Sequence, residues 1–363
     1  MTLRPLYGHE ELRTRLATSA KSERLPASLL LHGARGVGKQ RLAIWLAQLL
    51  LCERAAADGL EDPCGACQQC RYSLRLVHPD LHWFFPRPSL KDSSASDADV
   101  AADMSEAIAE RLAADGLWAP PSGSEGIYVK TMKALVHRAT LRPAMAKRAV
   151  FIVGDAERMV SQESSPEAAN TMLKLLEEPP PQTTLILTSS EPLSLLPTIR
   201  SRMVSIRVPS LSRAAVEAFL DDAAVQRRLP GTVREESIGR ASGAPGVLLA
   251  TDSTAVAFGA ARRLLDAALQ PSTPAGAVER IKAAARQGVA GARGAFSDML
   301  DALTVILHDR VRRLTNAGQD SDARRTAMAM ILVEEAKLRA NGNVSPQLLG
   351  ASLIASLHNT LRP

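Results

Sequence analysis

The stretch SLLLHGARGVGKQRLAIWLAQLLL, residues 28–51, decides the fold of this chain. It begins with an apolar strand candidate, Ser28–His32, continues through a glycine-rich loop and ends in a helical pattern. The loop has the spacing G-x-x-x-x-G-K, in which backbone N–H groups surround phosphate oxygens and the helix N-terminus adds its dipole. Its lysine is expected to reach the β- and γ-phosphates of a nucleotide. The predicted nucleotide-binding residues of this loop are Gly33, Gly36, Gly38 and Lys39.

The residue that follows the lysine departs from this pattern. In enzymes that hydrolyse nucleoside triphosphates, the residue after this lysine is Ser or Thr, and its hydroxyl helps to hold Mg²⁺. This chain has Gln40. Because an amide oxygen on a longer stem is poorly placed as that ligand, we expect ATP or ADP binding to be optional and efficient hydrolysis to be lost.

A second nucleotide-binding element is expected where the apolar strand Ala149–Val153 ends. Asp155 follows this strand and is predicted to lie near the metal ion of a bound nucleotide. In active ATPases of this arrangement the next residue is usually Glu, which activates water, but here it is Ala156. Glu157 lies one position further and points elsewhere if the chain stays extended. The alternative interpretation makes Glu157 the catalytic base.

Short apolar runs alternate with helix-length segments over the first two hundred residues. Mostly continuous apolarity over four to six residues is typical of strands in a parallel sheet that is covered on both faces. One intervening helix is expected over Glu167–Glu178, capped by Ser165 and with Pro166 in its first turn. The predicted strands are Ser28–His32, Leu81–Phe85, Ala149–Val153, Thr184–Thr188 and Val204–Val208.

The remaining segments divide into an insertion and a helical part. Residues of about 86–126 are rich in Ser, Asp, Ala and Pro, which predicts a mobile surface insertion without a core function. Strand signals end after Val208, and from about residue 255 only long amphipathic helices are expected. The apolar residues of 296–314 follow helical spacing, which we interpret as core or subunit packing.

The composition says more about where the chain is located than about which partners it binds. The net charge of +6 is compatible with a polyanionic partner and equally with an ordinary Arg-rich composition. No apolar run approaches the roughly 20 residues that cross a bilayer, and the N-terminus lacks the apolar core of a signal peptide. We therefore expect a soluble, cytoplasmic chain without a membrane partner.

All four cysteines lie between positions 52 and 70, with two-residue spacers between the last three. Four thiolates form a closed tetrahedral set for Zn²⁺ and leave no open position, so the expected metal is structural. Free cysteines in a reduced cytosol are the alternative, and His78 is an alternative ligand. The predicted zinc ligands are Cys52, Cys64, Cys67 and Cys70.

Six segments occur in the order that one known family shows. They are LLHGARGVGK, CGACQQC, HPD at 78–80, VFIVGDAERM, ANTMLKLLEEPP and TIRSR. Over about residues 5–210 they resemble the bacterial clamp-loader subunits of DNA polymerase III, which are AAA+ proteins. The resemblance implies an α/β fold with an all-α part. Its domains would be a RecA-like AAA+ core over 1–208 with a zinc module at about 52–75, a small helical lid over 209–254 and a helical collar over 255–363.

The resemblance also implies partners and a type of subunit. The partners are gamma/tau-type motor subunits and a delta-type subunit in a hetero-pentameric ring, which loads the sliding clamp onto primed DNA. Motor subunits keep a hydroxyl residue, an Asp-Glu pair and a lid arginine where this chain has Gln40, Ala156 and Gly246. These departures favour the delta-prime branch of the family, with weak or absent ATP hydrolysis. The alternatives are an active gamma/tau-type ATPase and a stand-alone, zinc-containing nucleic-acid-binding module, against which LLEEPP and TIRSR argue.

Arg202, in the TIRSR segment, resembles the family's arginine finger. Such a guanidinium projects into the ATP site of a neighbouring subunit and neutralises charge on the γ-phosphoryl group. Arg200 is a rival for this role, and a surface ion pair is the plainer interpretation of Arg202. Contacts with DNA are a weaker expectation, because a solvated basic surface explains the candidate residues equally well. These candidates are Arg138, Lys147 and Arg148.

Overall fold

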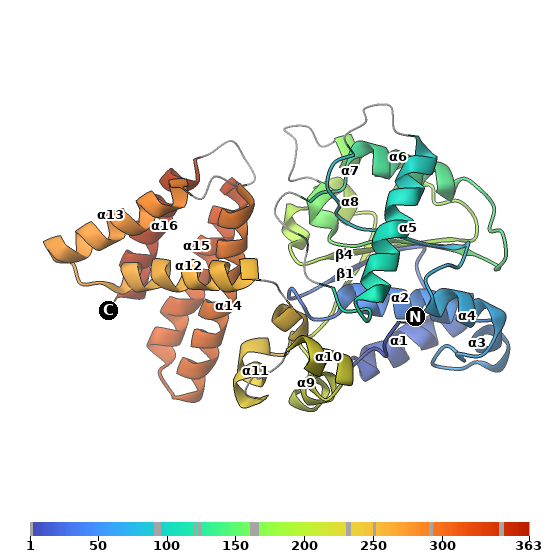
Figure 1. The fold of residues 1–363 in the computed structure, drawn as a ribbon, viewed down its shortest axis with the longest axis horizontal. Coiled ribbons are helices and arrows are strands. Elements are labelled where there is room, and N and C mark those ends of the chain that lie inside the picture. The colour runs from blue at the N-terminus through green and yellow to red at the C-terminus, as the bar shows by residue number, and fades with distance from the viewer. Residues whose placement is uncertain are drawn as a thin grey trace. The chain divides into compact units, whose positions relative to one another are not determined.

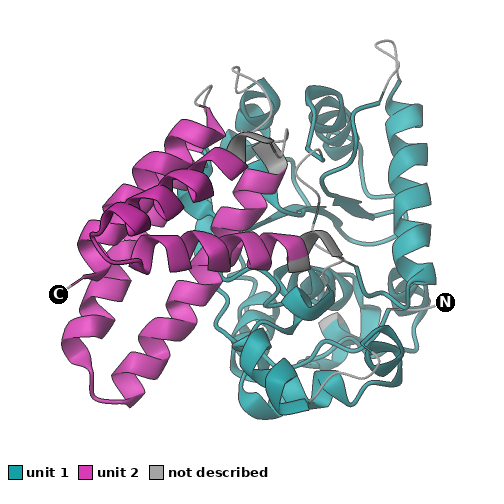
Figure 2. Cartoon of the chain, turned by 60° about the vertical axis from the view of Figure 1, so that its left-hand side comes forward, with its two compact units in different colours: residues 1–121, 125–249 teal, residues 122–124, 250–363 magenta. Residues whose placement is uncertain are grey.

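The computed structural model describes residues 3–90, 96–118, 121, 125–159, 167–229, 234–249, 252–289, 293–340 and 345–362. They fall into two compact units, of which the first ends at Leu249 and the second begins at Ala250 (Figure 2). The units divide close to the predicted start of the collar at residue 255. The division does not separate a lid from the core, so the lid as a domain of its own stays a prediction.

The first unit is built on a five-stranded, fully parallel sheet (Figure 1). The strand order is β2-β3-β4-β1-β5, which places the strand before the glycine loop between β4 and β5. The prediction of a parallel α/β sheet is confirmed, with strand ends shifted by at most one residue. The strands are β1 (Ser28–His32), β2 (Leu81–Phe84), β3 (Ala149–Val153), β4 (Thr183–Ser189) and β5 (Val204–Arg207).

Both faces of the sheet are covered by helices, and successive strand residues enter opposite cores. Leu31 and Ile152 pack into the core that includes α2, whereas Leu30 and Phe151 pack into the core that includes α6 and α7. This alternation is the two-residue period of a strand. The helices of the sheet region are α1 (Glu10–Lys21), α2 (Lys39–Leu51), α3 (Glu53–Asp58), α4 (Gln68–Leu74), α5 (Asp97–Ala113), α6 (Val129–Ala139), α7 (Glu167–Glu177) and α8 (Pro197–Arg200).

The predicted insertion over 86–126 is not a featureless surface segment. It contains the helix α5, which packs against α6 and buries Val100, Met104, Ala107 and Leu112 (Figure 1). A capping box starts this helix, because Ser96 and Asp99 bond to each other's backbone N–H groups. The prediction of a segment without a core function was therefore wrong, since these four side chains complete both cores of the sheet.

Short helices follow β5 and supply most of a small separate core within the first unit. This core includes Val216, Phe219, Val225 and Leu248. We call the region of these helices the lid region. Its elements are α9 (Arg213–Leu220), α10 (Ala223–Arg228), α11 (Arg234–Ala241) and the 3₁₀ turn η3 (Pro245–Leu249).

The second unit is all helical. The apolar residues predicted over 296–314 lie in α14, where Phe296, Met299, Leu300 and Leu303 are buried in the core of this unit. In the part of the chain that the structure describes, no helix is long and apolar enough to cross a membrane. The helices are α12 (Asp252–Leu269), α13 (Pro274–Val289), α14 (Arg293–Asn316), α15 (Asp320–Ala340) and α16 (Pro346–Leu361).

One predicted helix is confirmed except for its start. The helix expected over Glu167–Glu178 is α7, Glu167–Glu177. The predicted cap Ser165 and the first-turn Pro166 lie outside the described residues.

Candidate functional sites: a phosphate-loop pocket and a cysteine cluster

The glycine loop joins β1 to α2, and the carboxyl ends of β1, β3 and β4 meet beside it. Gly36 and Gly38 adopt left-handed backbone angles, with φ of 80° and 98°, which glycine adopts without strain. Gly38 is the residue before α2, so the loop runs directly into the helix N-terminus. The strand, loop and helix predicted from residues 28–51 are therefore all present.

Lys39 is buried and folded back onto its own loop. Its Nζ donates hydrogen bonds to the carbonyl oxygens of Gly33 and Ala34, at 3.0 and 2.9 Å, and to Ser190 Oγ at 2.8 Å. Burial lowers the pKa of Lys39, although the nearby carboxylates of Glu157 and Asp155 favour its charged form. An ammonium group has three donors, and all three are occupied here. Lys39 has to leave these partners before it can contact a phosphate.

Gln40 fills the space beside Asp155. Its Nε2 donates to Asp155 Oδ2 at 2.8 Å, and its Oε1 accepts from Trp83 Nε1 at 3.1 Å. A Cβ atom on Gly154 would lie only 2.4 Å from Gln40 Oε1, so the glycine makes room for this amide. The amide presents an N–H donor to the carboxylate where a nucleotide site would present a metal ion. In the structure, the Gln at position 40 thus bonds to the acidic residue after β3.

Glu157 lies closer to the pocket than the sequence suggested. The chain turns after Asp155 into the 3₁₀ turn η1 (Ala156–Met159) instead of staying extended. Glu157 Oε1 accepts a hydrogen bond from the backbone N–H of Ser190 at 3.1 Å. Among the described residues its buried Oε2 has no hydrogen-bond partner, and burial together with the charge of Asp155 raises the pKa of Glu157.

Ser190 is the pocket residue that sequence reasoning missed. It follows β4 and contacts both Lys39 and Glu157. The signal was the run of polar residues at the end of an apolar strand, because parallel strands place their carboxyl ends at one edge of the sheet. More than one strand ends in polar residues, and only the strand order decides which of them lie next to the glycine loop.

The lid region touches the glycine loop through backbone atoms. The N–H of Gly246 donates to the carbonyl of Gly36 at 2.9 Å, and a Cβ atom on Gly246 would lie 2.8 Å from Gly36 Cα. Position 246 therefore has no room for the side chain of a lid arginine in this arrangement. The remaining pocket, lined by Lys39, Gln40 and Asp155 among others, has a volume of about 150 Å³. This is below the roughly 300–1,000 Å³ of typical ligand pockets.

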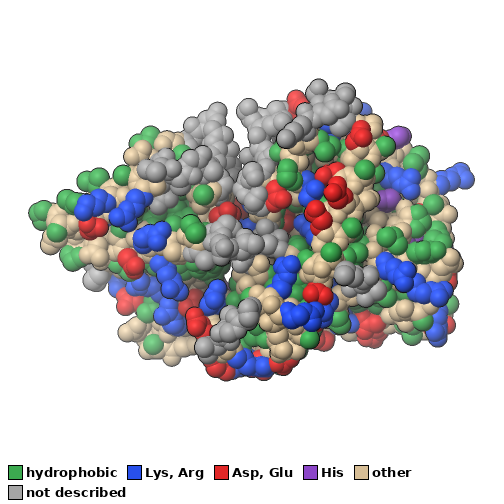
Figure 3. All heavy atoms as spheres, viewed as in Figure 1, with side chains coloured by type: hydrophobic (Ala, Val, Ile, Leu, Met, Phe, Trp, Pro, Cys, Tyr) green, Lys and Arg blue, Asp and Glu red, His purple; other side chains and the backbone are tan. Residues whose placement is uncertain are grey.

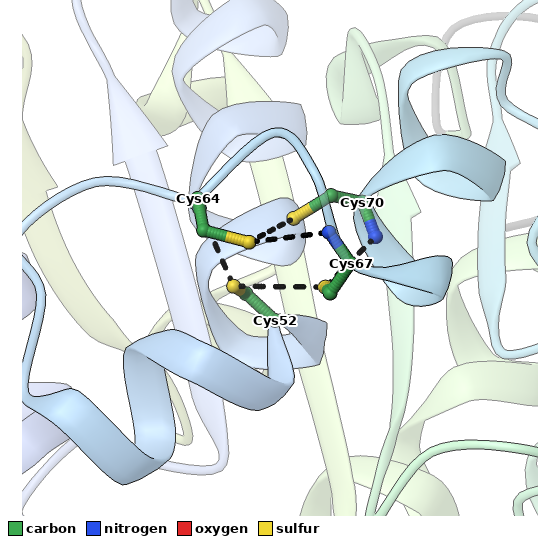
Figure 4. A group of neighbouring side chains, drawn as sticks. All are labelled: Cys52, Cys64, Cys67 and Cys70. Atoms are coloured by element: carbon green, nitrogen blue, oxygen red, sulfur yellow. Dashed lines mark hydrogen bonds between the residues drawn. The ribbon is translucent and has the colours of Figure 1, made fainter.

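The four cysteines come together as predicted, from the end of α2, the following loop and α4. Their Sγ atoms all lie within 4.8 Å of one another, and the side chains point toward a common centre (Figure 4). Two of the S–S distances are 4.0 Å, for Cys52 and Cys67, and 3.9 Å, for Cys64 and Cys70. Tetrahedral Zn²⁺ with Zn–S bonds of about 2.3 Å requires S–S distances of about 3.8 Å. The cluster therefore fits a zinc ion.

Backbone N–H groups support the thiolate form of this cluster. The N–H groups of Cys64, Cys67 and Cys70 each point at a cysteine sulfur, with N–S distances of 3.3 to 3.4 Å. Burial alone would raise the pKa of Cys64, but hydrogen bonds from the N–H groups of Cys67 and Ala66 and from the side chains of Cys52 and Cys67 together lower this pKa to about 6. Burial raises the pKa of Cys52 and of Cys70, so the cluster as a whole would depend on a bound metal ion to deprotonate these two thiols.

His78 is not part of the cluster, because both of its ring nitrogens are engaged elsewhere. Nδ1 accepts the backbone N–H of Asp80 at 2.9 Å, so Nε2 carries the proton and donates to Gln69 Oε1 at 2.5 Å. Within the described ranges, the side chains placed closely enough to hold a metal together are those of the four cysteines. The alternative that made His78 a ligand was wrong.

Arg202 lies at the surface in an ion pair within this chain. Its Nη2 donates to Glu177 Oε1 at 2.7 Å, and its Nη1 donates to the carbonyl of Thr198 at 2.9 Å. The side chain remains 34% exposed. The rival Arg200 is half-buried, and its Nε has no hydrogen-bond partner among the described residues. Neither Arg200 nor Arg202 lines the pocket beside Lys39 and Gln40.

The candidate DNA contacts do not behave alike. Arg138 bonds to His82 and to the carbonyl of Pro79, whereas Lys147 is exposed and Arg148 is half-buried. On the face shown in Figure 3, Lys and Arg side chains are interspersed with Asp and Glu. This face offers no argument for DNA binding beyond the net charge.

The parallel sheet, the loop of G-x-x-x-x-G-K spacing between β1 and α2, and the acidic residue after β3 together define an α/β core. A family described as DNA polymerase III, delta subunit, matches residues 8–212 of the chain. This match covers more than half of the sequence, and the chain belongs to that family.

Curated relatives carry related names. The subunit delta' of DNA polymerase III from Pseudomonas aeruginosa is 31% identical over 216 residues, covering 60% of this chain and 52% of that protein. The subunit delta' from Bacillus subtilis is 27% identical over 202 residues, 56% of this chain and 48% of the relative. The subunit tau/gamma from Haemophilus influenzae is 24% identical over 229 residues, 63% and 27% of the two chains. The chain thus spans about half the length of the delta' relatives it matches.

Proposed function

We propose that this chain is a delta-prime-type clamp-loader subunit that does not hydrolyse ATP efficiently and serves as a scaffold of the ring. Family membership and the delta' relatives support the type of subunit. Its partners would be gamma/tau-type motor subunits and a delta-type subunit, and the assembly would load the sliding clamp onto primed DNA.

The observation that carries the proposal is the Gln40–Asp155 hydrogen bond of 2.8 Å. Phosphoryl transfer depends on Mg²⁺ held next to the loop, and the amide of Gln40 lies where this ion would be held. Lys39 is bonded to its own loop, and Gly246 replaces an arginine that would contact the γ-phosphate. Each departure affects the same chemical task, so the chain would not supply its own hydrolysis.

The cysteine cluster would hold a structural zinc ion. Cys52, Cys64, Cys67 and Cys70 would supply four thiolates, leaving no position for water or substrate. When bound, the ion would tie the end of α2 to α4. The residues around it would keep this module folded, without taking part in a reaction.

Arg202 would act as an arginine finger in the ATP site of a neighbouring subunit. Glu177 holds the guanidinium at the surface, and this pair can open because both partners are solvent-accessible. An arginine finger has to be exposed on its own subunit before assembly so that it can enter the ATP site of the neighbour.

The test is an assembly experiment with the motor and delta-type subunits of the same organism. Wild-type chain should form the ring and show DNA-stimulated ATPase activity. Arg202→Ala should retain zinc and assembly but lose most of that activity, since fingers are worth about 10³ to 10⁵ in rate in other NTPases. Arg228→Ala, a change at another exposed arginine, is the matched control. Unchanged turnover with Arg202→Ala, together with a loss for Arg200→Ala, would assign the role to Arg200.

The second candidate function is an active gamma/tau-type ATPase. The observation that favours it is the place of Glu157, buried beside Ser190 and close enough to Lys39 for their charges to interact. Turnover of ATP by the purified chain, abolished by Lys39→Ala, would establish this function and exclude the scaffold role.

The second unit supports a role in assembly. On α15, Met328, Ile331 and Leu338 are 60%, 60% and 53% exposed, and their spacing places them on one helix face. Exposed apolar residues on one face are typical of an interaction surface. This face would pack against the collar helices of another subunit.

A further inference from the structure

A four-residue segment after α5, Asp115–Trp118, connects the sheet core with the lid region. Asp115 and Gly116 both have left-handed backbone angles, with φ of 60° and 68°, so the chain reverses sharply at the end of the helix. The N–H of Gly116 bonds to the carbonyl of Arg111 at 2.9 Å and fixes this turn. The turn sends the next two side chains into different cores.

Leu117 belongs to the core of the lid region. It is 6% exposed and lies in the same buried cluster as Phe219 and Leu248. Among the described residues it is the only buried member of that cluster from outside the lid region, and the half-buried Tyr7 packs against the same cluster with its ring 5.7 Å from that of Phe219. The insertion therefore contributes a core residue to a region more than ninety positions later in the sequence.

Trp118 belongs to the sheet side. Its ring lies 4.9 Å from that of Trp83 on β2, and the Arg111 guanidinium lies 5.2 Å from the Trp118 ring and 3.4 Å from the Phe85 ring. The Trp83 and Trp118 rings are tilted by 57°, and such a ring pair together with a guanidinium over an aromatic face adds directional attraction to apolar burial. Trp118 is thereby anchored to the same tryptophan that bonds to Gln40.

Ion pairs lie on either side of this connection. Asp115 pairs with Arg227 of α10 at 3.2 Å and with Arg4 at 3.7 Å, and Arg4 also pairs with Asp222 at the start of α10. The two pairs of Asp115 are solvent-accessible and contribute little on their own, but they orient the segment toward the lid region, whereas Asp222 in the pair with Arg4 is buried. Gly116, Leu117 and Trp118 also line the pocket at Lys39 and Gln40.

We propose that Asp115–Trp118 is an internal clasp that holds the lid region against the glycine loop without a nucleotide. In a nucleotide-binding core the ligand contacts both the loop and the lid and so joins them. In this chain Leu117 and Trp118 make that connection through protein side chains. The inference rests on the proposed function in one respect: a pocket that needs no nucleotide must be closed by the protein itself.

Hydrogen exchange of the full-length chain, followed by mass spectrometry, tests the clasp. In wild type, MgADP should leave exchange of α9, α11 and the glycine loop unchanged. Leu117→Ala should speed exchange of these segments about thirtyfold, because truncating a buried leucine removes a large part of the local stability. MgADP should then slow this exchange again, since the nucleotide regains a joining role. Leu193→Ala, a change at a leucine that is 72% exposed, is the matched control.

The clasp is overturned if a folded Leu117→Ala variant exchanges its lid region at the wild-type rate. Should that variant fail to fold, as judged by loss of zinc and of cooperative unfolding, Leu117→Val replaces it. Removing one methylene should speed exchange about fourfold, and an unchanged rate there would equally contradict the proposal. Failure of the proposed function appears in a separate measurement, as absent ring assembly or as ATP turnover by the wild-type chain alone.

Discussion

The phosphate-loop pocket and the cysteine cluster are both predicted from short motifs, but their side chains are in opposite states. In the cluster, four sulfurs face a common centre at distances that suit a metal ion. In the pocket, Lys39 and Gln40 already bond to protein groups. The cysteine cluster has the geometry of a ligand set that waits for a metal ion. In the phosphate-loop pocket, by contrast, the hydrogen-bonding groups of Lys39 and Gln40 are already occupied by protein groups.

This difference shows what motif spacing can and cannot decide. Spacing fixes the backbone, and both backbones are as predicted. The side chains beside the motif decide whether its donors and acceptors stay available. Gln40 replaces a short hydroxyl residue, and its longer stem reaches Asp155 directly. Beside the cysteines, His78 bonds to Gln69 and does not compete for the sulfurs.

Removing a cysteine should have the largest effect. Cys64→Ser should abolish stoichiometric zinc binding and lower the free energy of unfolding by about 4 kcal/mol, because loss of a structural metal is among the largest single-site effects. Metal analysis and denaturant unfolding measure both quantities. Arg71→Ala, at an exposed position in the same module, should change neither. A Cys64→Ser protein with full zinc content and unchanged stability would remove the distinction between the two sites.

Lys39 should contribute to stability and not only to nucleotide binding. Lys39→Met removes three hydrogen bonds and leaves the buried Glu157 without its neighbouring cation, so we expect a loss of about 2 kcal/mol in the absence of nucleotide. Chemical denaturation provides the measurement, with the exposed Lys147→Met as control. A lysine that waits for a ligand would instead give unchanged stability and lost nucleotide affinity.

Restoring the motif should make the pocket more like a ligand site. Gln40→Ser removes the amide that bonds to Asp155 and supplies a hydroxyl for Mg²⁺. We expect Mg²⁺ to tighten binding of a fluorescent ATP analogue about tenfold in this variant, or about 1.4 kcal/mol, and not at all in wild type. Turnover should stay absent, because position 156 is Ala and position 246 is Gly. Gln226→Ser, at an exposed glutamine, is the control. Magnesium-dependent binding by the wild-type chain would show that Gln40 does not block the site.

The sheet could be predicted because its strands are nearly continuous apolar runs, whereas α5 could not be recognised from composition. The Ser- and Asp-rich sequence before α5 suggested disorder, although Ser96 and Asp99 form a capping box. That box was a readable signal for a helix start. The spacing of Val100, Met104 and Ala107 then gives one apolar helix face. Because only four side chains of α5 are buried, the overall Ser- and Asp-rich composition of the segment did not indicate a packed helix.

The cysteine cluster was predictable because its ligands are local in sequence, and the pocket was predictable only in part. Ser190 and Trp83 reach the loop from other strands, so their contacts follow from the strand order. Glu157 was predicted to point elsewhere only if the chain stayed extended, and the chain forms a 3₁₀ turn there instead. The roles of Leu117 and Trp118 depend on packing between distant segments, which no local pattern reports.

Substitution of Arg202 should have the smallest effect on stability. Unlike the cysteines and Lys39, Arg202 belongs to a surface ion pair. Its partner Glu177 is 48% exposed, and exposed pairs are worth about 0.2 to 1 kcal/mol. A double-mutant cycle with Arg202→Ala and Glu177→Ala, measured by chemical denaturation, should give a coupling energy in that range. The cysteine sulfurs lie at distances that suit a metal ion, and Lys39 bonds to its own loop, whereas the Arg202 side chain bonds to Glu177 and to the carbonyl of Thr198 at the surface. A coupling energy several times larger would mean that the pair is structural, and the loss of ATPase activity in Arg202→Ala would then need another cause.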